Sequence, residues 1–528
     1  MSKENFMKKT RTQNTILNLI SGVVGEVIIY SLNFVTRTVF IQTLGKEYLG
    51  IGGLFVSILT VLSLTDLGIG GALNYRLYKP LEEKNEPKLK AIMNFYKSAY
   101  STIAVTILVI GLAIIPFLKY IIKDYAKVEA LGLSVGAIFT LYLLQSVSSY
   151  AFFAYKSAIV KADQKEYIVN FLGCIGSFAL CILEVVALKI TKSYTVYLAI
   201  TIVVNLCQSY VVAKVAEKQF PFLTQKNADK LSKDEIREVV RDCLFISMIS
   251  INSVVLKATD NIVISAFLGL EITGLYSNYL MIYNVFKKIS KRFIRASQAS
   301  VGNLFASSSI ETRMKYFYEL FLSTTIFCGI VCVCIANLTD EFISNWLGSD
   351  FVIPYPFAFL VALELYILVI RLVLAQMREV LGLFRQVKLR PVFEVIANII
   401  LSMLLVKRIG IFGVIIATIV SEVITVLPYD PIILFRYGFE NAKKVGGFYK
   451  KLGIYTVELG ISYAFSRYVC LNWMCGYQWL SWVIHGFICT LITGTVMITL
   501  NCRTNEFENL KRIAARMLWG KTIWKRKQ

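Results

Sequence analysis

Residues 254–274 read VVLKATDNIVISAFLGLEITG, an apolar run that carries a lysine, an aspartate and an asparagine on one helical face. Residues 30–50 read YSLNFVTRTVFIQTLGKEYLG and share with it the pattern Leu-Gly-x-Glu-x-x-Gly at a constant offset of 224 residues. The same offset carries Lys257, Asp260 and Asn261 onto Asn33, Thr36 and Arg37. A polar cluster therefore occurs twice at equivalent places, which indicates two related halves.

The composition is that of an integral membrane protein. Among 528 residues, 56% are hydrophobic and 17% are charged, against about 25% charged residues in a typical soluble domain. Apolar runs near the roughly 20 residues that a spanning helix needs recur with short connections between them. They predict an all-α integral membrane protein with about fourteen transmembrane helices, at residues 15–43, 47–75, 90–118, 128–153, 167–188, 194–216, 240–267, 272–300, 313–338, 352–377, 388–406, 410–435, 447–469 and 475–500.

The net charge is +22, and the basic residues are distributed unevenly between the two sides of this predicted topology. When the spans are threaded alternately through a bilayer, 43 of the 56 Lys and Arg residues fall in one set of connections and termini, and 9 fall in the opposite set. Basic residues concentrate on the cytoplasmic side of membrane proteins. We therefore predict that both termini are cytoplasmic, and nucleic acid is not an expected partner.

The offset of 224 residues equals six spans, so both halves begin on the same side of the membrane as parallel repeats. We predict an N-terminal six-helix lobe at 1–225, a C-terminal six-helix lobe at 226–437, an accessory helix pair at 438–502 and a basic cytoplasmic tail at 503–528. The linker between the lobes breaks at Pro221 and re-enters a helix with a capping box at Ser232 and Glu235. The tail either lies on anionic lipid as an amphipathic segment or is solvated.

Residues suited to catalysis or to metal binding are sparse. The eleven cysteines show no metal-type spacing, and we interpret them as packing residues. His485 is the only histidine, interpreted as a packed or interfacial residue, which leaves little room for histidine-based acid–base chemistry. We predict that the protein is not an enzyme and holds no catalytic residue, metal or other cofactor. Coupling to Na⁺ or H⁺ stays open.

Ionisable residues inside the predicted spans are the main functional signal, because each costs about 2.5–3.5 kcal/mol at mid-helix. With neighbouring polar residues they form two stripes, which we predict to line a water-filled cationic cavity where the lobes meet. The stripe on the first span is Glu26, Tyr30, Asn33 and Arg37, and the stripe on the seventh is Ser250, Ser253, Lys257, Asp260 and Asn261. The residues predicted to bind an anionic substrate there are Arg37, Lys257, Asn33, Asn261 and Arg371. Those predicted to couple an ion or to regulate the charge are Glu26, Asp260, Asp66 and Glu364.

Structural alternatives to this cavity stay open. Lys257 and Asp260, three residues apart, can neutralise each other as a packing pair. Arg37 can snorkel toward the membrane interface. Asp66 precedes a glycine cluster, at 68, 70 and 71, that is typical of a bend or a close helix contact. Four further glutamates in or near spans are interpreted as solvated at helix ends: Glu184, Glu394, Glu422 and Glu458.

At these residues the chain resembles a known family. DNIVISAFLGLEITGLYSNY, at 260–279, is similar to the seventh and eighth helices of bacterial lipid-linked oligosaccharide flippases of the multidrug, oligosaccharidyl-lipid and polysaccharide exporter superfamily. TVFIQTLGKEYLGIGGL at 38–54 and LTDLGIGGAL at 64–73 resemble the matching first and second helices. The likeness extends over essentially the whole chain through span number and paired halves.

The resemblance implies a two-lobed, MATE-like transporter of the bacterial plasma (inner) membrane that works by alternating access. Its cargo would be an undecaprenyl-pyrophosphate-linked oligosaccharide repeat unit, moved from the inner to the outer leaflet for synthesis of surface polysaccharide. Expected partners are this lipid-linked glycan, membrane lipids, and a polysaccharide polymerase with glycosyltransferases. The two extra helices resemble those that give related peptidoglycan-precursor flippases a groove for the lipid tail.

Two rival functions are weighed. A small-molecule or drug exporter of the same superfamily would share the fold, and charge in the cavity favours an anionic cargo over a cationic drug. A membrane-embedded polysaccharide polymerase should show a large outward loop with catalytic residues. The longest predicted outward connection, around Asp340 to Asp350, is short and acidic.

Overall fold

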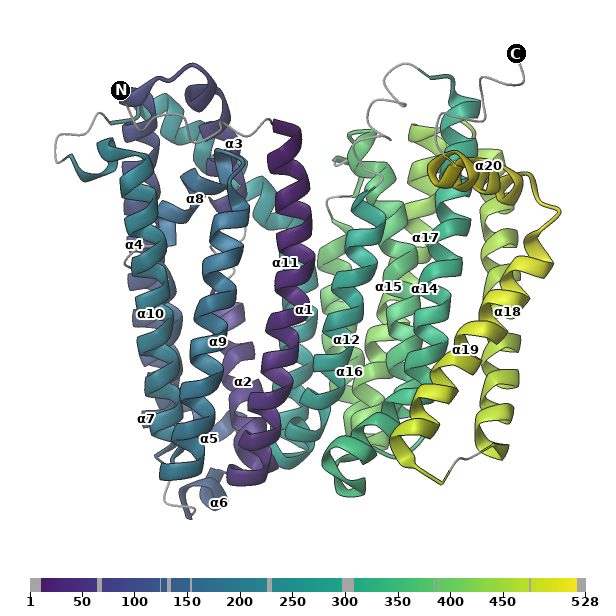
Figure 1. The fold of residues 1–528 in the computed structure, drawn as a ribbon, viewed down its shortest axis with the longest axis horizontal. Coiled ribbons are helices and arrows are strands. Elements are labelled where there is room, and N and C mark those ends of the chain that lie inside the picture. Colours follow the sequence, from purple (N-terminus) through teal and green to yellow (C-terminus); the bar gives the residue numbers. More distant parts are fainter. Residues whose placement is uncertain are drawn as a thin grey trace. The chain divides into compact units, whose positions relative to one another are not determined.

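The computed structural model describes residues 11–63, 69–123, 125–130, 134–151, 154–225, 230–296, 308–383, 385–387, 389–473 and 476–519. These ranges form helices and contain no strand. The chain divides into two compact units, Met1–Gly274 and Leu275–Gln528 (Figure 1). This division comes later in the chain than the lobe boundary predicted from the repeat, at 225–226. The reason is that α11 (Lys233–Phe267) contacts α2 (Lys46–Leu62) and α3 (Ile69–Glu82) of the first unit.

The remaining helices follow one another through short connections. In the first unit they are α1 (Arg11–Leu44), α4 (Glu86–Ile114), α5 (Leu118–Ile121), α6 (Tyr125–Ala130), α7 (Val135–Ala151), α8 (Ala154–Ala162), α9 (Glu166–Thr191) and α10 (Tyr194–Gln219). After α12 (Leu270–Ala296), they are α14 (Ile310–Leu347), α15 (Phe357–Val380), α16 (Arg390–Ile409), α17 (Ile411–Ile433), α18 (Val445–Asn472), α19 (Gln478–Asn501) and α20 (Asn505–Trp519).

Every one of the fourteen predicted ranges is occupied by helix. The second range, 47–75, holds α2 up to Leu62 and α3 from Ile69, and the bend predicted at the glycine cluster stays a prediction because residues 64–68 lie outside the described part of the chain. Within the described residues, eight helices are long and apolar enough to cross a membrane unaided, or nine if the bent pair α7 and α8 counts as one span. The others are shorter or more polar, as in α16 with Arg390, Glu394 and Lys407.

Apolar side chains occupy the outer faces of these helices as well as the core. On α9, Phe171, Ile175, Phe178, Ile182 and Val186 follow one another at helical spacing and are all exposed. A stripe of this kind would be a large apolar patch in water, whereas it suits the hydrocarbon of a bilayer. The protein is therefore a multi-pass membrane protein, as its sequence predicts.

The cores are built from different side chains in the two units. In the first unit, aliphatic residues of α3, α4 and α8 pack together, with Leu77, Ile92 and Ile159 almost fully buried. In the second unit, α14 and the turn that follows α17 meet α18 through buried phenylalanine rings, at Phe317, Phe321, Phe435, Phe439 and Phe448. Aromatic rings prefer such edge-on or offset contacts to a face-to-face sandwich.

The linker after α10 forms as the sequence predicts. A 3₁₀ turn at Pro221–Thr224 follows α10, and α11 begins with the predicted capping box between Ser232 and Glu235. Glu235 also pairs with Lys88 of α4, and the hydrogen bond from this ammonium lowers the pKa of the Glu235 carboxyl to about 2. Arg76 of α3 pairs with Glu238 at 3.4 Å, so two ion pairs hold the start of α11 on the first unit.

The tail contains one helix that differs from the spans. In Figure 1, α20 runs across the long helices of the second unit, next to α14. Its first turns are attached by Glu506 to Lys451 and by a 2.9 Å hydrogen bond from Asn509 to Glu319. The following residues, Lys511 and Arg512, are exposed. Contact of this helix with anionic lipid stays a prediction, and residues 520–528 lie outside the described part of the chain.

The repeated motif forms one symmetrical contact within the first unit. Gly45 and Gly269 both have φ near +100°, at 98° and 99°, which favours glycine, and each precedes a helix. A Cβ added at Gly50 would lie closer than 3.0 Å to the backbone of Leu270, and one added at Gly274 would lie equally close to the carbonyl oxygen of Lys46. Lys46 also pairs with Glu271.

Replacing either close-contact glycine should destabilise the fold. For Gly50→Ala and Gly274→Ala we expect a loss of about 1–3 kcal/mol or more, because the new methyl group collides with backbone that cannot rotate away. Thermal unfolding of the purified protein in detergent measures the loss. Gly460→Ala is the matched control, since no atom lies within 4 Å of its added Cβ. Equal melting temperatures for Gly50→Ala and the control would contradict this contact.

Candidate functional site

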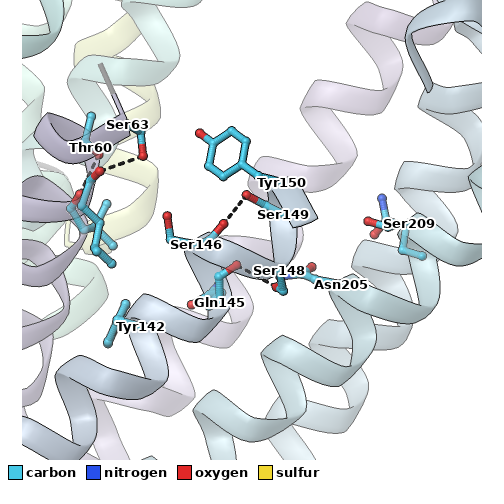
Figure 2. Close-up of a pocket in the computed structure, with 13 residues that line it drawn as sticks. Thr60, Ser63, Tyr142, Gln145, Ser146, Ser148, Ser149, Tyr150, Asn205 and Ser209 are labelled. Atoms are coloured by element: carbon cyan, nitrogen blue, oxygen red, sulfur yellow. Dashed lines mark hydrogen bonds between the residues drawn. The ribbon is translucent and has the colours of Figure 1, made fainter. Parts of the chain in front are cut away.

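A cavity of about 540 Å³ lies inside the first unit between α2, α7 and α10. Figure 2 shows Thr60 and Ser63 on one side, Ser209 on the other, and the residues of α7 between them. The cavity is lined by Val56, Leu59, Thr60, Ser63, Tyr142, Gln145, Ser146, Ser148, Ser149, Tyr150, Asn205, Gln208 and Ser209. None of these lining residues carries a charge.

The hydroxyl groups of this pocket are arranged to accept hydrogen bonds. Ser63 donates to the carbonyl of Leu59 at 2.8 Å, and Ser148 and Ser149 donate to carbonyls three residues earlier, at 2.8 and 2.7 Å. A hydroxyl group has one hydrogen and two lone pairs, so lone pairs remain for a ligand that donates. The amides of Gln145, Asn205 and Gln208 add both donors and acceptors.

The local sequence explains why these groups meet. QSVSSY at 145–150 places several polar side chains on the last turns of α7, and Asn205, Gln208 and Ser209 share one face of α10 at spacings of three and four. Tyr142 is fixed by the hydroxyl of Tyr194 at 2.8 Å and lies against Gly52, where a side chain would collide with it. This pocket was not predicted from the sequence, although neutral polar residues repeated at helical spacing inside apolar spans could have indicated it.

The predicted stripe on α1 is present, with different degrees of burial along it. Glu26 and Arg37 are half-buried, and Asn33 is exposed. The Arg37 side chain interacts electrostatically with Tyr197 of α10. The substrate and coupling roles predicted for these residues stay predictions.

Two described members of the second stripe, on α11, pack in the interior of the first unit. Asp260 and Asn261 are 1% and 8% exposed. The Asn261 amide donates a 2.8 Å hydrogen bond to Ser57, which ties α11 to α2. Lys257 belongs to α11, but its side chain lies outside the described part of the structure, as does Asp66. Whether Lys257 pairs with Asp260 therefore stays open.

A network of buried charges joins three helices of the second unit. Arg371 of α15 donates to Glu394 of α16 at 2.7 Å and to Glu422 of α17 at 3.0 Å. Asp430 of α17, 0% exposed, accepts from Arg390 at 2.7 Å and pairs with Arg378 at 3.1 Å. Glu364, seven residues before Arg371 on α15, is buried near Tyr283 of α12. Arg371 is therefore closely matched by carboxylates.

The interpretation of four glutamates as solvated at helix ends is wrong. Glu184, Glu394, Glu422 and Glu458 are 4%, 0%, 4% and 5% exposed. Glu394 and Glu422 hold Arg371, Glu184 accepts a 2.7 Å hydrogen bond from Thr201, and Glu458 accepts one of 2.8 Å from Asn501. The position of a glutamate in the sequence does not show that it is buried, because the partners of these four glutamates come from other helices.

Removing one charge from the network should cost more than removing a surface charge. For Asp430→Asn we expect a loss of about 3–5 kcal/mol, because Arg378 and Arg390 keep their charge in a buried position without the carboxylate between them. Thermal unfolding in detergent gives the loss, with Asp350→Asn as the control at an exposed aspartate. An unchanged melting temperature for Asp430→Asn would show that the network does not hold α15, α16 and α17 together.

No family model and no curated protein matches the chain. Among solved structures it is similar to the lipid II flippase MurJ in an inward closed conformation, with 14% identity and a TM-score of 0.60 over 92% of this chain and 100% of that one. It is also similar to an inward-facing multidrug resistance MATE family transporter of the MOP superfamily, with 13% identity and a TM-score of 0.59 over 79% of this chain and 95% of that one. The chain therefore has the all-helical membrane fold that these transporters share.

Proposed function

We propose that this protein is a flippase that moves undecaprenyl-pyrophosphate-linked oligosaccharide repeat units from the inner to the outer leaflet of the bacterial plasma membrane by alternating access. The observation that carries the proposal is the uncharged pocket between α2, α7 and α10, which is rich in hydroxyl and amide groups. Neutral sugars present many hydroxyl donors and no charge, so an uncharged pocket of acceptors and amides matches them.

The pyrophosphate of such a cargo needs cations, because a buried phosphate without compensation is very costly. We propose Arg37 and Lys257 as these cations, and we propose that they line one cavity. The polyprenyl chain can stay in the hydrocarbon, beside helices with exposed apolar faces such as α9. Transport would draw on an ion gradient or on the membrane potential, worth about 2.3 kcal/mol per charge per 100 mV. Cytoplasmic termini follow from the distribution of Lys and Arg.

Export of a small molecule or drug is the second candidate function, supported by the similarity to MATE transporters. Two observations favour the flippase. A cationic drug is expected to need a carboxylate, and the lining of the pocket contains none. The lipid II flippase also covers a larger share of the chain, 92% against 79%. An enzymatic role, such as a polymerase, has no support in the pocket, whose lining lacks a carboxylate, a histidine and a cysteine.

Substitutions in the pocket should weaken binding of the sugar part of the cargo. For Gln145→Leu combined with Asn205→Leu, we expect about tenfold weaker binding of lipid-linked oligosaccharide, because each lost hydrogen bond contributes about 0.5–1.5 kcal/mol. Binding of polyprenyl pyrophosphate without sugar should not change. Titration in detergent with both lipids measures this, with Gln42→Leu as the control at an exposed amide outside the pocket. Equal loss for both lipids, or for neither, argues against a sugar site.

Substitutions of the two candidate cations should weaken binding of both lipids, unlike substitutions in the pocket. For Arg37→Ala or Lys257→Ala, we expect loss of transport in proteoliposomes and weaker binding of both lipids, because the pyrophosphate is common to both. Insertion and melting temperature should stay close to those of the unsubstituted protein. Unchanged transport would reject these residues as phosphate ligands and leave the pocket prediction standing.

A further inference from the structure

His485 lies inside the second unit, where α19 packs against α14 and α18. It is the only histidine among 528 residues and is 5% exposed. Its ring contacts two other segments at once. Nδ1 lies 2.9 Å from the Glu341 carboxylate of α14, and Nε2 lies 2.8 Å from the carbonyl oxygen of Trp473, which follows α18.

Both ring nitrogens therefore face hydrogen-bond acceptors. A backbone carbonyl can only accept, so Nε2 must carry a hydrogen. An ionised carboxylate also only accepts, so Nδ1 must carry one as well. A neutral imidazole has one N–H group, whereas the imidazolium has two. The observed geometry is thus satisfied only when the histidine–glutamate pair holds one more proton than a neutral imidazole beside a carboxylate.

The groups around the ring place this proton on His485. In water a carboxyl group loses its proton near pH 4 and an imidazolium near pH 6.5. On α14, Asp340 is the residue before Glu341, and it accepts a 2.7 Å hydrogen bond from Tyr279. From α18, Arg467 lies over the ring of Tyr355 at 4.5 Å, and Cys470 contacts Cys489, one turn from His485, at 3.9 Å. Glu341 is the carboxylate that meets the ring directly.

We propose that His485 and Glu341 form a proton-binding site that clamps Trp473, at the end of α18, and the start of α19 onto α14. Neighbouring contacts run along the same seam, since Trp482 donates to the carbonyl of Leu338 at 3.2 Å and Asn337 donates to Ser466 at 3.0 Å. Loss of the proton would leave a lone pair of Nδ1 facing the carboxylate. The clamp is therefore closed while the imidazolium persists and is released as the pH rises.

The single histidine makes the test direct. In protein labelled with ¹⁵N-histidine and reconstituted in lipid, the side-chain nitrogens of one residue report the ring. At pH 7.5 a free imidazole is about nine-tenths neutral, whereas we expect both nitrogens of His485 to be protonated. In Glu341→Gln we expect the ring to be neutral at this pH, with the hydrogen retained on Nε2 for the Trp473 carbonyl. Glu508→Gln, at an exposed glutamate of α20, should leave the ring as an imidazolium.

The unsubstituted protein decides the proposal by itself. A ring with one N–H group at pH 7.5 in the native protein would overturn it, whatever the variants do. Amide hydrogen exchange gives the conformational readout. After correction for the intrinsic rate, exchange at the start of α19 should rise on going from pH 7 to pH 9 in the native protein. It should change little in Glu341→Gln, where the ring is already neutral and no longer loses a proton over this pH range. The same exchange profile in both proteins would also count against a clamp.

Discussion

A charge inside an apolar helical bundle must meet an opposite charge or several hydrogen bonds, because hydrocarbon supplies neither. The second unit depends on this constraint. Arg371 of α15 reaches Glu394 of α16 and Glu422 of α17, and Asp430 gathers two further guanidinium groups. Each ion pair fixes how one helix is rotated about its axis relative to the next. Apolar packing alone sets such rotations less strictly, because many side chains of similar size can fill the same groove.

The same constraint is met by different means in the first unit. Its pocket between α2, α7 and α10 is lined by hydroxyl and amide groups, and several of these satisfy themselves by donating to carbonyls of their own helix. Neutral groups need no counter-charge, so they can line a cavity large enough for a ligand at a modest cost. Ion pairs close the space between helices, whereas hydroxyl-lined helices can leave it open. This difference is why the first unit, taken by itself, contains the better candidate for a sugar site.

The sequence predicted what depends on neighbours along the chain. The apolar runs located helix in all fourteen ranges, and Ser232 with Glu235 marked the start of α11. It failed where the answer depends on which helix faces meet. Glu394 and Glu422 looked like residues at helix ends, and no local pattern shows that both point at Arg371 from different helices. The pocket was missed for the same reason, since its three helices contribute separate short polar patterns.

The repeated motif shows how one local pattern can still carry long-range information. In LGKEYLG and LGLEITG, the first glycine has a positive φ and precedes a helix. The glutamate lies in the first turn of that helix, where the helix dipole favours a negative charge. The last glycine has no side chain to cover its backbone. Each copy places its backbone against the last glycine of the other, Leu270 at Gly50 and Lys46 at Gly274. A side chain at either glycine would push the two backbone segments apart and break both contacts. A motif whose two copies need each other in this way explains why the same residues recur 224 positions apart.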